Sequence, residues 1–82
     1  MSAVAFTDDQ LAASKAVARA IGEAIRSRRL ARNETQEAVA HRLGTHPTTV
    51  SRIESGAFHN AKLGSVLKLL HEFHLTLDVR DL

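Results

Sequence analysis

The spacing of apolar residues predicts a mainly α chain with four helices. Between residues 8 and 32, apolar and alanine side chains recur every three or four positions, which is the spacing of one helix face. Two shorter segments, around residues 35–44 and 47–54, repeat this pattern, and a fourth follows Asn60, which we expect to cap it. The buried stripe expected on the fourth helix is Leu63, Val66, Leu67, Leu70 and Phe73. This stripe should supply much of the core.

The apolar spacing changes after Phe73. Leu75, Leu77 and Val79 alternate with polar residues through Arg80, and a two-residue repeat is typical of a half-buried β-strand. A lone strand leaves backbone N–H and C=O groups without partners, which a second copy of the chain can supply. We therefore predict that residues 75–80 form a short strand that pairs antiparallel with its own copy across a twofold dimer.

The residues between the second and third helices predict a tight turn. Thr35 can accept a hydrogen bond from a free amide in the first turn of the second helix. Gly44 suits the left-handed conformation that ends a helix, and Pro47 suits the first turn of the next one. The third helix has a narrow apolar stripe, Val50 and Ile53, and carries Thr, Ser and Arg on its other faces. Two short helices joined in this way form a helix-turn-helix.

Residues 35–56, TQEAVAHRLGTHPTTVSRIESG, resemble the Cro/repressor-like helix-turn-helix family, also called the XRE type. The matching residues are Thr35, Gln36, Ala40, Leu43, Gly44, Val50, Ile53, Glu54, Ser55 and Gly56. The resemblance implies a lambda-repressor-like four-helix DNA-binding domain. It also implies that Arg29 and Glu54 form a structural ion pair and that Gln36 contacts a DNA phosphate.

The alternating tail narrows this resemblance to antitoxins of the HipB type. In that type the terminal strands of two subunits pair, the dimer binds operator DNA, and a kinase-like toxin is held inactive. The partners implied are an inverted-repeat operator, a second copy of the chain, and a HipA-like kinase or another toxin. Two alternatives stay open: a stand-alone phage-like or stress regulator without a toxin, and a protein-interaction module with vestigial DNA binding.

Composition adds a basic patch to this picture. The chain has 82 residues, no cysteine and a formal net charge of +2, which favours one small domain in the reducing cytoplasm, associated there with the nucleoid. Residues 1–7 lack periodicity and are expected to be flexible, so that residues 8–82 form the single domain. Residues 21–32 hold four arginines against one glutamate. Such a cluster beside a base-reading helix favours phosphate contact.

Candidate DNA contacts follow from position on and near the third helix. Arg can bind guanine bidentately and a Thr methyl can touch a thymine methyl, so base contacts are expected from the outer face of this helix. A purely capping role for Thr49 is an equal alternative. The expected base-contacting residues are Thr48, Thr49, Ser51 and Arg52, and the expected phosphate-contacting residues are Gln36, Arg26, Arg28, Arg32 and Asn60.

Catalytic and metal chemistry find little support in the sequence. His71 and His74 share a helix face, but there is no cysteine and no third ligand at a recognisable spacing. No glycine-rich elbow presents a nucleophile. We therefore expect no metal, no cofactor and no enzymatic activity.

Overall fold

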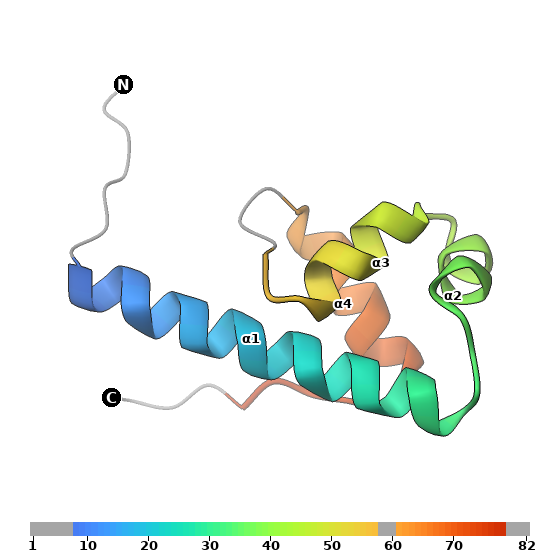
Figure 1. Ribbon diagram of the computed structural model, residues 1–82, viewed down its shortest axis with the longest axis horizontal. Coiled ribbons are helices and arrows are strands. Elements are labelled where there is room, and N and C mark those ends of the chain that lie inside the picture. The colour runs from blue at the N-terminus through green and yellow to red at the C-terminus, as the bar shows by residue number, and fades with distance from the viewer. Residues whose placement is uncertain (1–7, 58–60, 79–82) are drawn as a thin grey trace.

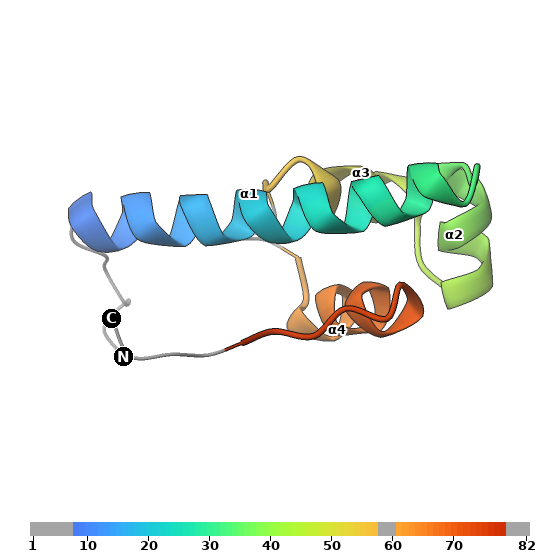
Figure 2. The ribbon, with the colours of Figure 1, turned by 90° about the horizontal axis from the view of Figure 1, so that it is seen from below.

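The computed structural model describes residues 8–57 and 61–78, in which four helices form (Figure 1). They are α1 (Asp8–Ala31), α2 (Gln36–Leu43), α3 (Pro47–Glu54) and α4 (Leu63–Glu72). Figure 2 shows α1 and α3 in one layer and α4 in a second, with α2 at the end of the molecule. The mainly α prediction is confirmed. The expectations for residues 1–7, Asn60, Val79 and Arg80 lie outside the described residues.

The turns around α2 form as their residues predict. The Thr35 hydroxyl accepts a hydrogen bond from the Ala38 N–H at 3.1 Å and so caps α2. Gly44 ends the helix in the left-handed conformation with φ 67°, and Pro47 opens α3. Asn33 also has a positive φ, 55°, where the chain leaves α1. These residues place α3 directly against α2 as the second helix of a helix-turn-helix.

The core draws side chains from all four helices, and on α4 it differs from the predicted stripe. The buried apolar residues are Ile25, Val39, Ala40, Val50, Ile53, Val66, Leu69, Leu70 and Phe73. Leu69 is buried, whereas Leu63 and Leu67 are 67% and 47% exposed, so the prediction was wrong at these positions. Because the apolar face of α4 is wider than the surface that α1, α2 and α3 offer, Leu63 and Leu67 fall on its uncovered edge.

Two glycines allow α1 and the end of α3 to approach at backbone distance. Gly22 is buried, and a Cβ atom there would lie only 2.3 Å from the Ile53 carbonyl oxygen and 2.5 Å from that of Glu54. Gly56, just past α3, has φ +80°, and a Cβ there would lie 2.9 Å from Arg19 Cα. The orientation of α3 therefore depends on the absence of side chains at these two positions.

We expect Gly22→Ala to destabilise the domain by about 1–3 kcal/mol, the usual cost of overpacking. This loss should appear in urea unfolding although alanine is the better helix former by roughly 1 kcal/mol. Gly64→Ala is the matched control, because an added Cβ in α4 meets nothing within 4 Å. Equal stability of the two variants would show that α1 and α3 can separate freely.

The two ends of the described chain lie away from the core. The first half of α1 projects beyond the other helices (Figure 1), and Val17 on it is 59% exposed. After α4, the chain runs back toward this projecting half, in the layer of α4 (Figure 2). Leu75 packs against the core, but residues 75–78 form no strand in the single chain. The pairing of residues 75–80 with a second copy therefore stays a prediction.

Candidate nucleic-acid interface

The outer face of α3 is polar and open to solvent. Val50 and Ile53 are fully buried on its inner face. Thr48, Ser51 and Arg52 are exposed, and Thr49 is half-buried. Of the four predicted base-contacting residues, three therefore lie on the outer surface of the helix, and Thr49 stands at its edge.

Two grooves flank α3. One, of about 670 Å³, lies between α3 and the start of α4, and its lining includes Thr49, Arg52, Lys62, Ser65 and Lys68. The other, of about 700 Å³, lies between α3, α1 and the start of α2. It is lined by Arg26, Gln36, Ser51 and Ser55, and also by the acidic residues Glu34, Glu37 and Glu54. The helix is therefore a ridge with cations on its α4 side, whereas on its α1 side Arg26 lies among polar and acidic residues. This shape suits a helix that enters the major groove of DNA between two phosphate backbones.

A buried ion pair fixes the end of this ridge. Arg29 Nε lies 2.6 Å from Glu54 Oε2, and Arg29 Nη2 lies 3.0 Å from Glu54 Oε1. Both residues are less than a tenth exposed. Arg29 Nη1 also donates to the Glu34 carbonyl at 2.7 Å. The hydrogen bonds to Glu54 raise the pKa of Arg29 above its ordinary value, so this pair holds α1, α3 and the loop before α2 together in charged form.

A family model described as helix-turn-helix matches residues 25–79, more than half of the chain. The chain belongs to the helix-turn-helix family. The match supports the XRE type, and with it DNA binding and transcription regulation. Comparisons with curated proteins and with solved structures returned no match.

In this helix-turn-helix domain the side chain of Gln36 is engaged internally. Its Nε2 donates to Glu54 Oε1 at 3.1 Å, so Gln36 extends the buried pair. The phosphate contact predicted for Gln36 therefore stays a prediction, and its side chain would have to share this hydrogen bond or leave the contact to the backbone N–H groups at the start of α2.

The basic cluster on α1 does not act as one surface. Arg26 lines the groove beside α3, but Arg28 lines neither groove, because residues two apart are about 200° apart around a helix. Arg32 turns to the end of α4, where Nη2 donates to the Glu72 carbonyl at 3.0 Å and the guanidinium lies 4.7 Å from the centre of the Phe73 ring. Of the three arginines predicted to contact phosphates, only Arg26 is placed beside α3 in a way that favours this role.

Three cations that were not predicted from the sequence also lie in this helix-turn-helix domain, beside the α3 ridge or between its helices. Lys62 and Lys68 join Arg52 in lining one groove. Arg42 lies 2.9 Å from both Glu34 and Glu72, which links α2 to α4 and to the preceding loop. Its hydrogen bonds to Glu34 lower the pKa of that carboxyl group. Lys62 follows the motif by only six residues, and this proximity was the one available signal.

The described residues contain no group of three or more His, Asp or Glu side chains placed to hold a metal ion. Within the same residues, no helix has the length and apolar character needed to cross a bilayer.

Proposed function

We propose that this protein is a dimeric, sequence-specific DNA-binding repressor that acts by binding and not by catalysis, and that it is the antitoxin of a toxin–antitoxin pair. The observation that carries the DNA-reading part is the α3 ridge. Its exposed Thr48, Ser51 and Arg52 are flanked on the α4 side by a groove that Lys62 and Lys68 line. Arg52 makes no ion pair within the described residues, so its guanidinium is available to a guanine edge.

Replacing Arg52 tests this reading. A duplex enriched from a random-sequence pool by the wild-type protein serves as the operator, and an unselected duplex of the same length serves as random DNA. We expect Arg52→Ala to cost roughly 1–3 kcal/mol on the operator, to relax preference at one base pair per half-site, and to affect random DNA less. Lys68→Ala, in the same groove, should weaken both duplexes alike. Equal losses for Arg52→Ala on both duplexes would assign Arg52 to the DNA backbone instead.

The dimer part of the proposal is supported by the apolar surface that one chain leaves uncovered. Leu63 and Leu67 on α4 and Leu77 in the tail are all at least 44% exposed, and none of them lines either groove beside α3. Pairing of residues 75–80 with their copy would give both tails backbone partners and cover apolar surface near α4. A twofold dimer also spaces two α3 helices for adjacent turns of DNA, about 34 Å apart.

The antitoxin part rests on the resemblance to HipB-type proteins, in which the motif, a further helix and an alternating tail follow one another. The neighbouring genes provide the test. We expect an adjacent reading frame whose kinase-like product arrests growth when expressed alone and is neutralised by this chain. A regulator whose neighbours encode no such product would instead be the stand-alone type.

A further inference from the structure

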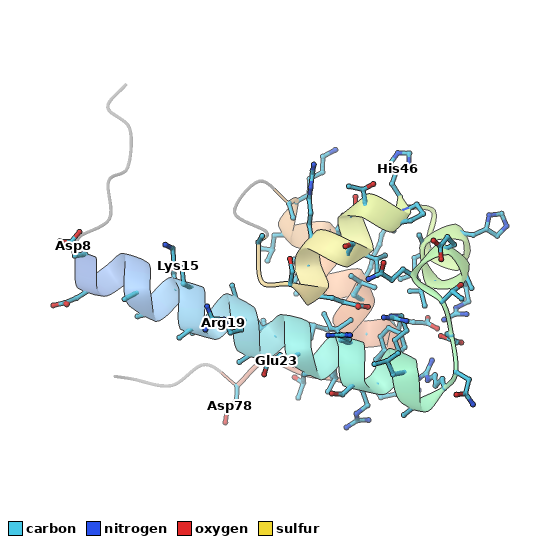
Figure 3. All side chains as sticks on the ribbon, viewed as in Figure 1. Asp8, Lys15, Arg19, Glu23, His46 and Asp78 are labelled. Carbon is cyan, nitrogen blue, oxygen red and sulfur yellow. The ribbon has the colours of Figure 1, made fainter. Side chains whose placement is uncertain are left out.

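Three cations form a row along one flank of α1. Arg19 and Arg26 follow Lys15 by four and eleven residues, which places them only about 40° and 20° around the helix from it. All three are exposed, and none forms an ion pair within the described residues. We call Lys15, Arg19 and Arg26 the basic flank. Its acidic neighbours on α1 are the terminal Asp8 and Asp9 and also Glu23, which follows Arg19 by one helical turn, at the edge of the flank. In the view of Figure 3, Lys15 points upward from the helix and Glu23 downward.

The basic flank adjoins the DNA-reading ridge. Gly22, which lies within the row, is the residue that approaches the Ile53 and Glu54 carbonyls at the end of α3. The backbone of Arg19 borders Gly56 directly after α3. Arg26 lines the groove that also contains Ser51. The basic flank therefore runs from Arg26 in this groove, where Glu34, Glu37 and Glu54 also lie, along α1 onto its projecting half.

The opposite flank of α1 has a different character. It carries small and apolar residues, which are Ala13, Val17, Ala20 and Ala24. Arg28 also lies on that side, about 200° from Arg26. The two cations of the projecting half, Lys15 and Arg19, therefore lie on the side on which α3 lies, where they could meet a polyanion; Asp8, at the far end of the helix, is on the same side.

We propose that Lys15 and Arg19 bind phosphates of the operator duplex beyond the base pairs that α3 reads. Neither residue belongs to the segment 25–79 that the family model matches, so this contact is an addition to the family's domain. Lys15 and Arg26 are separated by about 16 Å along α1. Measured along the duplex axis, where each strand has one phosphate per about 3.4 Å, that length corresponds to four or five phosphates of one strand. The proposal rests on the proposed DNA binding.

Salt titration of the full chain tests the basic flank, with the enriched duplex and an unselected 30-bp duplex as probes. Lys15→Gln/Arg19→Gln should lower the slope of log K against log salt by about 1.8 on both probes, and Arg19→Gln alone by about 0.9. Between about 50 and 200 mM salt, the fold-loss of affinity should then be roughly ten times smaller for the double variant than for the wild type. Hydroxyl-radical footprints should shorten at their outer ends. Arg28→Gln is the matched control, since it removes one charge from the opposite flank.

The outcomes separate this inference from the proposed function. An unchanged slope in the double variant overturns the role of the flank while DNA binding by the wild type stands. If Arg28→Gln lowers the salt slope as much as Arg19→Gln does, the role of the flank is also overturned, because net charge alone would then explain the effect. A double variant that sediments as a monomer assigns the flank to a subunit contact and overturns it as well. Failure of the wild type to bind any duplex rejects the proposed function itself, without reference to any variant.

Discussion

Arg29→Ala should destabilise the domain by about 3–5 kcal/mol, because it leaves the Glu54 carboxylate buried and without its main partner. Glu54 is 6% exposed and would keep only the hydrogen bond from Gln36. The variant would also lose the contact from Arg29 to the Glu34 carbonyl. A domain of this size has a total stability of about 5–15 kcal/mol, so the loss should be visible as a large shift of the urea midpoint.

A double variant distinguishes the unpaired charge from the lost geometry. Arg29→Met/Glu54→Leu removes both charges and retains apolar volume, and such replacements of buried pairs are often neutral or stabilising. We expect it to recover most of the stability that Arg29→Ala loses. If the double variant is as unstable as the single one, the pair stabilises the fold by fixing the positions of α1 and α3 and not by balancing charge.

Local signals in the sequence were sufficient for the helices and turns. Thr35, Asn33 and Gly44 adopt the conformations that their own chemistry favours, and each depends mainly on residues within one helical turn. The bounds of α1 were predicted within one residue, because its apolar and alanine spacing continues from one end to the other. The helix-turn-helix motif could be recognised for the same reason, since it is a set of residue types at fixed offsets.

Contacts between distant segments were not accessible in this way. Periodicity identified α4 as amphipathic, but it could not say which part of a wide apolar face the same chain would cover, so Leu63 and Leu67 were misplaced. The need for glycine at position 22 arises from carbonyls about thirty residues later. The arginines of residues 26–32 read as one cluster along the sequence, yet the helix distributes them around its axis.

The dimer prediction depends on the residues that the single chain leaves uncovered. Leu77 is 44% exposed, and the alternation of residues 75–80 places it on the same strand face as Leu75, which packs against the core. In an antiparallel pair that apolar face would lie on the α4 helices of both subunits. The register of the pair is then fixed, because a slip of one residue would turn every apolar side chain to water. A two-stranded ribbon is marginal alone, so packing on α4 must support it. Leu77→Asp should therefore prevent dimerisation.

We expect Leu77→Asp to sediment as a monomer, to keep its helical circular dichroism, and to bind a full inverted repeat at least about 100-fold more weakly, because two half-sites are no longer held by one molecule. Thr76→Asp is the matched control: it adds the same carboxylate one residue away, on the face turned to solvent, and should remain a dimer. A chain ending at Leu75 should behave like Leu77→Asp, since it keeps the residue that contacts the core but removes the rest of the strand. If that truncated chain is dimeric and binds the full operator with unchanged affinity, the tail is not the dimerisation element, and the resemblance to HipB-type antitoxins loses its main support.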